Sequence, residues 1–299
     1  TLNGVACEAA STPAVVNVTN APLPILTGTA SSSSASATGV VSDTLTICPG
    51  ESVTFTGSGG LSYRFLKDNI EVQARGTANT YSTTLLLNNE AITVEVFDAV
   101  TGGCSAESEE IVIVYSPVPV VGLSSTAVAD TFCTNDSITF TGTSNVAGSQ
   151  YEFFIGNTSV AGPSTTASFT SIAGAITDGS TVTVVVTTPA GCSSTATLTM
   201  IENQVSGGVV ATASSTICIN DTPGAIAVNS STVSGTATYQ WQISNDNITY
   251  TNLSGVAAQS ATYTPTSAIS TTTYYRRITI STLNGVACEA ASTPAVVNV

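Results

Sequence analysis

The amino-acid sequence predicts an all-β chain made of consecutive sandwich domains. Segments such as SVTFTG, ITVEVFD and STVTVVV alternate apolar with polar side chains and are rich in Val, Ile, Thr and Phe, as strands are. Gly, Asn, Asp and Pro interrupt these segments at short intervals, and no segment shows a convincing period of 3.6 residues. One set of landmarks also recurs three times in the same order, which predicts three copies of one domain type.

Two cysteines and an aromatic pair mark each copy. The first cysteine opens CPGESVTF, CTNDSITF or CINDTPGA, and the second lies in GGCSAESEEIVIVY, AGCSSTATLTMIE or VACEAASTPAVVNV. Between them lies YRF, YEF or YQW. Several short strands in roughly 94 residues, with one buried aromatic on a central strand, are typical of an immunoglobulin-like sandwich. The sequence therefore predicts three immunoglobulin-like β-sandwich domains placed end to end.

The expected domain boundaries fall in short joints. TNAPLPIL and YSPVPVV each contain two prolines, whereas the third joint, IENQVSGGVV, relies on two glycines. Proline-containing linkers are extended and semi-rigid, so the glycine joint should be the softest. In chain order we expect the C-terminal strands of a preceding third domain, then three complete domains, at 1–18, 19–115, 116–202 and 203–299.

The two ends of the sequence are identical. Thr1–Val18 and Thr282–Val299 both read TLNGVACEAASTPAVVNV, 281 residues apart. We interpret the chain as slightly more than one period of a longer tandem array, with a unit of three domains. The alternative is a polymer of separate subunits, in which each subunit donates its first 18 residues to the next.

The cysteines predict one disulfide inside each domain, because each domain holds one cysteine of each set. Such bonds would tie one pole of each sandwich and imply an oxidising compartment. Cys7 would be unpaired within this chain, with a Cys218 equivalent in the adjacent repeat as its partner. The predicted pairs are Cys48–Cys104, Cys133–Cys192 and Cys218–Cys288.

The aromatic landmarks predict core residues. Phe65, Phe153 and Trp241 occupy the matching position of the three copies, so we expect all three to be buried. Tyr239 and Trp241 also share a strand face, which leaves a sugar-binding platform as the alternative for the third copy.

Composition disfavours an enzyme and a nucleic-acid partner. The chain has no His, five Lys and Arg residues and a net charge of −14, whereas phosphate backbones require clusters of basic side chains. Its acidity would repel anionic lipid, and no apolar run approaches the ~20 residues that span a bilayer. The acidic stretch SAESEE suggests either a cation site or a solvated strand edge, and we favour the edge. We expect no cofactor and no membrane insertion.

Longer strings carry a family resemblance. TYQWQISNDNITYTNLSG and ATYTPTSAISTTTYYRRITIS resemble the Ig-like repeats of very large surface proteins of Bacteroidota. ICPGESVTFTGSGGLSYRFLKDN and TPAGCSS resemble the PKD-like repeats of the same proteins. The resemblance implies export, often by the type IX route, and display as an adhesin or gliding-associated filament. It also implies O-glycosylation at Thr44 in DTL and at Ser137 in DSI, although ordinary strand-entry turns explain both motifs better.

These observations predict a structural spacer in a giant extracellular, filament-forming surface protein. The expected partners are adjacent identical repeats along a fibre, laterally associated fibres, and surface glycans or other cells. The alternatives are an array of glycan-binding modules and an accessory stalk of a secreted polysaccharide-degrading enzyme.

Overall fold

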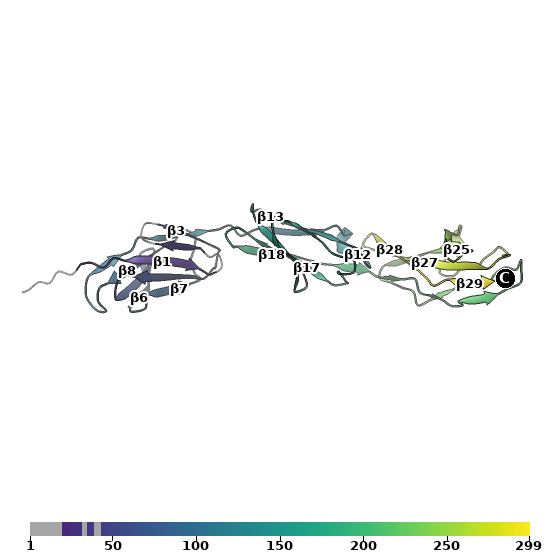
Figure 1. The fold of residues 1–299 in the computed structure, drawn as a ribbon, viewed down its shortest axis with the longest axis horizontal. Helices are drawn as coiled ribbons and strands as arrows, with labels where there is room; N and C mark the ends of the chain where they lie inside the picture. Colours follow the sequence, from purple (N-terminus) through teal and green to yellow (C-terminus); the bar gives the residue numbers. More distant parts are fainter. Residues whose placement is uncertain (1–19, 32–34, 39–42) are drawn as a thin grey trace, which may run out of the picture. The chain divides into compact units, whose positions relative to one another are not determined.

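The computed structural model describes residues 20–31, 35–38 and 43–299. Within these residues the only helical elements are two short 3-10 helices, η1 (Val128–Asp130) and η2 (Val256–Gln259), and all other elements are strands (Figure 1). The predicted fold class is confirmed, since the chain is all-β and its strands form consecutive immunoglobulin-like sandwiches. The boundaries at 19–115, 116–202 and 203–299 stay predictions.

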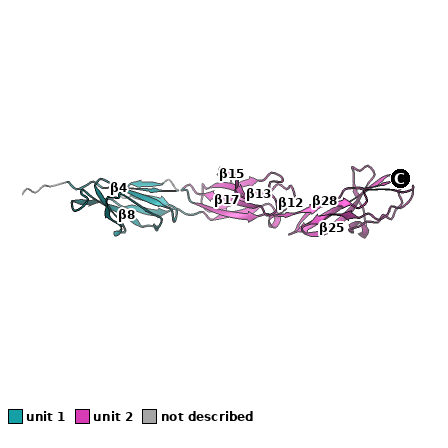
Figure 2. Cartoon of the chain, turned by 90° about the horizontal axis from the view of Figure 1, so that it is seen from below, with its two compact units in different colours: residues 1–118, 190–192 teal, residues 119–189, 193–299 magenta. Residues whose placement is uncertain are grey.

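The chain divides into two compact units (Figure 2). Unit 1 comprises residues 1–118 together with 190–192, and unit 2 comprises residues 119–189 and 193–299. The first sandwich belongs to unit 1, whereas the second and third sandwiches belong to unit 2, apart from the short segment 190–192.

Two sheets build the first sandwich. One has the strand order β2-β1-β4-β7, and the other has the order β3-β10-β8-β5-β6, with β9 paired to β8. The strands are β1 (Ile25–Ala30), β2 (Ser36–Thr38), β3 (Asp43–Ile47), β4 (Val53–Ser58), β5 (Ser62–Lys67), β6 (Ile70–Gly76), β7 (Thr80–Thr83), β8 (Ala91–Phe97), β9 (Ser105–Glu107) and β10 (Ile111–Tyr115).

The second sandwich places β11-β13-β16 against β15-β14-β17-β18, and β12 pairs with β19. Its strands are β11 (Val121–Ser125), β12 (Thr131–Cys133), β13 (Thr139–Ser144), β14 (Gln150–Ile155), β15 (Thr158–Ser164), β16 (Ser168–Thr170), β17 (Thr181–Thr187), β18 (Ser193–Thr199) and β19 (Ile201–Asn203).

The third sandwich has one long sheet, β22-β29-β27-β25-β26, with β28 paired to β27, and two short pairs, β20-β24 and β21-β23. Its strands are β20 (Val205–Ser206), β21 (Val209–Val210), β22 (Ser214–Thr216), β23 (Val228–Asn229), β24 (Thr232–Val233), β25 (Thr236–Ser244), β26 (Thr251–Asn252), β27 (Thr273–Leu283), β28 (Val286–Ala291) and β29 (Ala295–Asn298).

Alternation along the strands places one hydrophobic core in each sandwich. In β8 every second side chain is buried, and in β17 the buried residues are Val182, Val184 and Val186. Because successive strand side chains point to opposite faces, this pattern buries one face of each sheet. The three cores are centred on Phe55 and Phe65, on Phe140 and Phe153, and on Trp241.

The first cysteine of each copy lies at the end where the chain leaves its sandwich. β3, β12 and β22 each run parallel to the last strand of their own sandwich, which is β10, β19 and β29 respectively. Cys48 directly follows β3, whose Ile47 pairs with Tyr115 at the end of β10. The second cysteine lies on a hairpin at the opposite pole; Cys104, for example, precedes Ser105, which pairs with Phe97 at the end of β8.

The structure corrects the predicted disulfides. Cys48 is bonded to Cys192, and Cys133 is bonded to Cys288, with Cα atoms 5.5 Å apart in both pairs. Each bond joins the first cysteine of one sandwich to the second cysteine of the next. The three predicted pairs, Cys48–Cys104, Cys133–Cys192 and Cys218–Cys288, are therefore wrong.

Strand register explains why Cys48 and Cys104, the predicted pair of the first sandwich, cannot form a disulfide. Ile111 pairs with Ile92, so Cys48 and Cys104 lie at opposite ends of the same sheet. About ten residues of strand separate them, roughly 33 Å, whereas a disulfide requires Cα atoms within ~7 Å. Cys7 lies outside the described residues, but its counterpart Cys288 is bonded to Cys133 and not to Cys218.

Candidate functional site: the junction between the second and third sandwiches

Four residues form the junction between the second and third sandwiches. Cys133 pairs with Asn203 across β12 and β19, and Ser281 pairs with Cys288 across β27 and β28. The disulfide joins Cys133 to Cys288, and hydrogen bonds join Asn203 to Ser281. Two cross-strand pairs from neighbouring sandwiches are thus connected twice, once by a covalent bond and once by hydrogen bonds.

Asn203 is completely buried, with 0% of its surface exposed. Its Nδ2 donates to the carbonyl oxygens of Ser281 at 2.8 Å and of Val286 at 2.9 Å. Its Oδ1 accepts from Ser281 Oγ at 2.6 Å, and that hydroxyl in turn accepts from the backbone N–H of Gly235 at 2.9 Å. Both amide donors are satisfied, so this buried polar contact need not destabilise the junction.

The β27–β28 hairpin projects toward β12. Its two-residue turn is Asn284-Gly285, and both residues have positive φ, 50° and 84°, as a type I′ turn requires. Asn284 Nδ2 donates to Thr131 Oγ1 at 3.0 Å, and Thr131 is only 1% exposed. An asparagine in this turn therefore both sets the hairpin geometry and contacts the preceding sandwich.

The same backbone turn follows the first cysteine of each sandwich. The N–H three residues on donates to the cysteine carbonyl at Cys48, Cys133 and Cys218, at 3.1, 3.0 and 3.0 Å. The residue two positions on has positive φ in all three turns, namely Gly50, Asn135 and Asn220. This combination is the pattern of a type II turn, in which Gly and Asn are favoured at that position.

Acidic side chains reinforce the first two turns. Glu51 Oε2 accepts from the backbone N–H of Cys48 at 2.9 Å, and Asp136 Oδ2 accepts from that of Cys133 at 2.8 Å. Glu51 and Asp136 are thus turn formers. Cys218 is exposed and has a free thiol, and Cys104, at the opposite pole of its sandwich, is also exposed.

The predicted core aromatics lie on equivalent central strands. Phe65 on β5, Phe153 on β14 and Trp241 on β25 are 0%, 1% and 0% exposed. Each contacts a second ring, that of Tyr81, Phe169 or Tyr263, with centroids about 6 Å apart. Trp241 Nε1 also donates to the carbonyl of Ser260 at 2.9 Å, so its polar edge is satisfied inside the core.

Tyr239 contacts a buried arginine. The Arg277 guanidinium lies 4.3 Å from the centroid of the Tyr239 ring and is only 2% exposed. It donates to the carbonyl of Ala261 at 2.7 Å and to Ser231 Oγ at 2.8 Å. Burial lowers the pKa of Arg277 from its ordinary value. Tyr239 and Trp241 therefore do not form an accessible aromatic pair, because the Trp241 ring is inside the core.

The two candidate glycosylation positions differ in their contacts. Thr44 is exposed on β3. Ser137 is exposed too, but its hydroxyl donates to the carbonyl of Ser171 in a short hydrogen bond. Ser137 and Val286 also line a cleft of about 230 Å³ at the junction.

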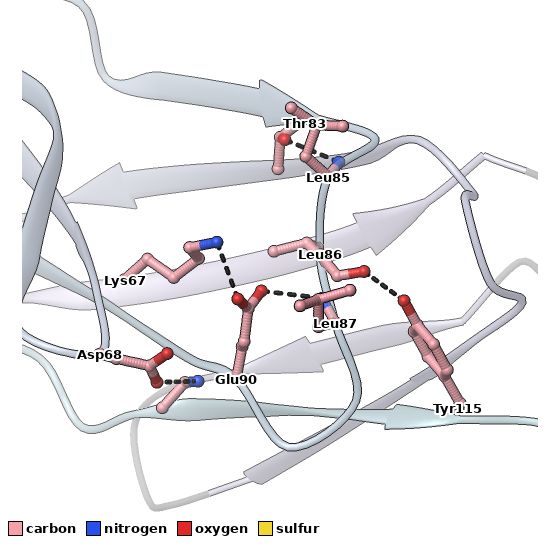
Figure 3. Close-up of polar contacts among 9 residues, drawn as sticks. Lys67, Asp68, Thr83, Leu85, Leu86, Leu87, Glu90 and Tyr115 are labelled. Atoms are coloured by element: carbon pink, nitrogen blue, oxygen red, sulfur yellow. Dashed lines mark hydrogen bonds and ion pairs between the residues drawn. The ribbon is translucent and has the colours of Figure 1, made fainter.

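A polar cluster in the first sandwich fastens the loop between β7 and β8 (Figure 3). Lys67 Nζ lies 2.8 Å from Glu90 Oε1, and Glu90 Oε2 accepts from the backbone N–H of Leu87 at 2.8 Å. The Tyr115 hydroxyl donates to the carbonyl of Leu86. The hydrogen bond to Glu90 raises the pKa of Lys67. These groups satisfy one another, which indicates a structural role.

Other site types find no support in the part of the chain that the structure describes. No three His, Cys, Asp or Glu side chains there are grouped so as to hold a metal ion. None of the helices in residues 20–31, 35–38 and 43–299 is long and apolar enough to cross a membrane.

Sequence reasoning missed Asn203 and Ser281, which carry the hydrogen bonds of the junction. A signal was present, because Asn203 is a polar residue at the end of the last strand of its sandwich, where Cys133 pairs with it. Ser281 pairs with Cys288 in the same way. Residues opposite a cysteine are thus the ones to inspect for junction contacts.

A known protein family matches one part of the chain. A family described as "Domain of unknown function (DUF8696)" matches residues 206–299. No curated protein sequence matches the chain.

Solved structures with similar folds include tandem immunoglobulin-like and fibronectin-like proteins. The three N-terminal domains of the bacteriophage RB49 Highly Immunogenic Outer Capsid protein are 15% identical, with a TM-score of 0.41, over 84% of this chain and 94% of theirs. The N-terminal eight Ig domains of Down Syndrome Cell Adhesion Molecule are 10% identical, with a TM-score of 0.38, over 86% and 36%. Fibronectin(III)-like modules of Clostridium thermocellum CbhA are 11% identical, with a TM-score of 0.34, over 58% and 94%. A similarity of this degree supports no inference about function.

Proposed function

We propose that this chain is a structural spacer, a repeat of a giant extracellular, filament-forming surface protein. The observation that carries the proposal is the pairing of the cysteines: each disulfide links one sandwich to the next. A bond inside a sandwich would stabilise that sandwich alone. A bond between neighbours limits how far the chain lengthens where one domain unfolds, which is a property that suits a load-bearing stalk.

The two disulfides enclose overlapping stretches of chain. One spans Cys48 to Cys192 and the other spans Cys133 to Cys288, so residues 133–192 lie within both. The shortest covalent route between the chain ends uses both bonds, from Cys48 to Cys192, back along the chain to Cys133, and on to Cys288. The bonds therefore limit how far the whole chain can extend as long as both are intact.

The setting of this spacer belongs to the same proposal. Disulfides persist in oxidising compartments, which favours an extracellular location. The resemblance to Ig-like and PKD-like repeats of giant Bacteroidota surface proteins supports type IX export and an adhesin or gliding-associated fibre. Adjacent identical repeats, laterally associated fibres, and glycans or other cells at the fibre tip are the proposed partners. Thr44 is the better-placed candidate for O-glycosylation, since it is exposed on β3.

No observation favours the alternative of a glycan-binding array, because the aromatic residue on which it depended, Trp241, is buried. The alternative of a stalk on a polysaccharide-degrading enzyme depends on domains elsewhere in the gene.

Single-molecule pulling tests the mechanical role. With both disulfides intact, the shortest covalent route between the chain ends runs from Cys48 to Cys192, back along the chain to Cys133 and on to Cys288, and it contains about 120 residues, roughly 420 Å when fully extended. After reduction the whole chain extends to roughly 1,000 Å. We expect the limit to rise about 2.5-fold on reduction. An oxidised chain that extends past roughly 900 Å would show that the bonds bear no load and would contradict the proposal.

Labelling of intact cells tests the location. An antibody against the folded chain should decorate fibres on the surface of unpermeabilised cells that carry the gene. Labelling confined to the interior of permeabilised cells would overturn the extracellular assignment.

A further inference from the structure

We propose that the open edge of strand β25 binds an uncharged, extended segment of a partner polypeptide, which adds to the sheet as one further strand. The edge is that of residues 236–240, the first half of β25 (Thr236–Ser244). The proposal concerns an interaction surface of the third sandwich, and it does not depend on the mechanical role of the disulfides.

The three sandwiches differ in how this edge is covered. In the first, the seven-residue strand β6 pairs with β5 from Tyr63 onward. In the second, the seven-residue strand β15 pairs with β14 from Tyr151 onward. In the third, β26 has two residues and pairs with β25 only at Gln242 and Ile243. In the part of the chain that the structure describes, Tyr239, the third of the recurring tyrosines, therefore has no strand beside it on that edge.

The backbone groups of Ala237 and Tyr239 point to this open edge. In an antiparallel sheet the N–H and C=O of one residue point to one side, and those of the next residue point to the other. On the β26 side, the carbonyl of Trp241 accepts from the N–H of Leu253 at 2.9 Å. Ala237 and Tyr239 are two and four residues from Trp241, so their N–H and C=O groups face the same side. Pairing with β26 begins only at Gln242, which leaves these groups open to a further strand.

A cleft of about 540 Å³ lies beside these groups. Residues 237–240 of β25 line one side, and Gln259 and Ala261, at the end of η2 and just beyond it, line another. A neighbouring strand lies 4.7–4.9 Å away in a sheet, so the cleft is where an added strand would be. A single extended segment fits there, whereas the edge of another folded sandwich carries a second sheet about 10 Å away and would meet Gln259 and Ala261.

The chemistry of the cleft indicates an uncharged segment. The cleft is lined by Ala, Thr, Tyr, Gln and Ile residues. A charged side chain bound there would lose its water without gaining an opposite charge, and the net charge of −14 disfavours an acidic segment. β-Branched residues favour strands and pack well opposite an aromatic ring such as that of Tyr239. Strand addition to a sheet edge combines such side-chain contacts with backbone hydrogen bonds.

The pairing predicts which residues of the segment face β25. β6 and β15 run antiparallel to their partners, and the added strand should do the same. The residue directly opposite Tyr239 then places its side chain on the same face as the Tyr239 ring and points its own N–H at β25. The residues on either side of it point their N–H groups away. A peptide in which two residue types alternate can therefore distinguish the two sets of N–H groups.

A synthetic peptide tests the proposal. The probe is Thr-Val-Thr-Val-Thr-Val-Thr with both ends capped, titrated into the full oxidised chain by calorimetry. In one version the backbone nitrogens of the three valines are methylated, and in the matched control those of the last three threonines are methylated. Valine is the residue expected opposite Tyr239, so methylation of the valines should weaken binding at least about tenfold relative to the control.

Hydrogen exchange measured by mass spectrometry locates the bound peptide. The unmodified peptide should slow exchange in residues 236–241 and leave β6 and β15 unchanged. Ala237→Pro removes an N–H that faces the open edge and that β27 does not use, so it should weaken binding at least about tenfold. Ile248→Ala, at an exposed side chain outside the cleft, should leave binding unchanged. The Cys133–Cys288 disulfide checks that each variant has folded.

Three results would overturn the proposal. One is a Kd above about 1 mM for the unmodified peptide. Another is equal affinity of the two methylated peptides, or slowed exchange at an edge other than residues 236–241. The third is a dimer of the chain without peptide that Ala237→Pro dissociates in analytical ultracentrifugation, which would assign the edge to a second copy of this chain.

Discussion

The turns at Cys133 and Cys218 are built alike but lie in different surroundings. Both have the same backbone hydrogen bond and an asparagine with positive φ, at Asn135 and Asn220. The Cys133 turn is bonded to the next sandwich, whereas Cys218 is exposed with a free thiol. The difference shows that local sequence determines the turn, while the following sandwich determines whether its cysteine is bonded.

The hydrogen bonds beside the two turns differ in the same way. Beside Cys133, Asn203 is buried and contacts Ser281 and Val286 of the next sandwich. Beside the Cys218 turn, Asn298 donates to Ser214 Oγ at 3.2 Å, a contact within its own sandwich. A junction therefore requires both a turn that presents the cysteine and a following hairpin that reaches it.

The largest effect should come from removing the junction disulfide. Cys133→Ser with Cys288→Ser opens a loop of 155 residues, which the chain-entropy relation values at about 5 kcal/mol of unfolding free energy. Urea unfolding followed by fluorescence is suitable, because Trp241 is the only tryptophan and is buried in the third sandwich. Cys218→Ser is the matched control and should change stability by less than about 0.5 kcal/mol. If the double variant and the Cys218→Ser control lose the same free energy of unfolding, the turns at Cys133 and Cys218 do not differ in the way described here.

Truncation of Trp241 should come next. Trp241→Ala removes a completely buried ring that contacts Tyr263, and we expect a loss of about 4 kcal/mol. Circular dichroism during thermal unfolding measures it, with Ile248→Ala as a control at a side chain that is 83% exposed. If Trp241→Ala behaves like the exposed control, the third sandwich does not depend on the core described above.

The hydrogen bonds of the junction should contribute less. Asn203→Ala leaves the buried carbonyls of Ser281 and Val286 without their donor, at a cost of about 2 kcal/mol. A double-mutant cycle with Ser281→Ala isolates the direct coupling, which should be between about 0.5 and 3 kcal/mol. Additive effects, with no coupling energy, would mean that the disulfide alone connects the two sandwiches.

The smallest effect should be a pH dependence of the stability of the third sandwich. Burial raises the pKa of Tyr275 to about 12 from its ordinary value of 10.0. An unfolded chain releases this proton above pH ~10, whereas the folded chain retains it until pH ~12, so stability is complete below pH 10 and falls between the two values by about 1–2 kcal/mol. In the Tyr275→Phe variant, the free energy of unfolding measured with urea should change less between pH 9 and 11.5 than it does in the unsubstituted chain. If the free energy of unfolding falls as steeply with pH in that variant, groups other than Tyr275 cause the pH dependence.

Much of the fold was predictable from local patterns. Alternation in segments such as β8 and β17 predicted the strands, and the recurring aromatic position identified Phe65, Phe153 and Trp241, which the structure places in the three cores. These features depend on residues close in sequence and on the period of two in a strand.

The disulfide pairing was not predictable in this way, because it depends on which strands are parallel. Assigning Cys48 and Cys104 to one bond assumed that both lie at one pole. The parallel pair β3–β10 places Cys48 at the exit of its sandwich, and the antiparallel pair β8–β9 places Cys104 at the entrance. Asn203 was missed for the same reason, since its importance appears only when β12 and β19 are aligned.

Disulfide mapping of the oxidised chain tests the central claim most directly. Free thiols are alkylated, the protein is digested without reduction, and the linked peptides are identified by mass spectrometry. The account predicts linked peptides for Cys48 with Cys192 and for Cys133 with Cys288, and an alkylated Cys218. Linked peptides for Cys48 with Cys104, Cys133 with Cys192, or Cys218 with Cys288 would show that each bond closes a single sandwich and would contradict it.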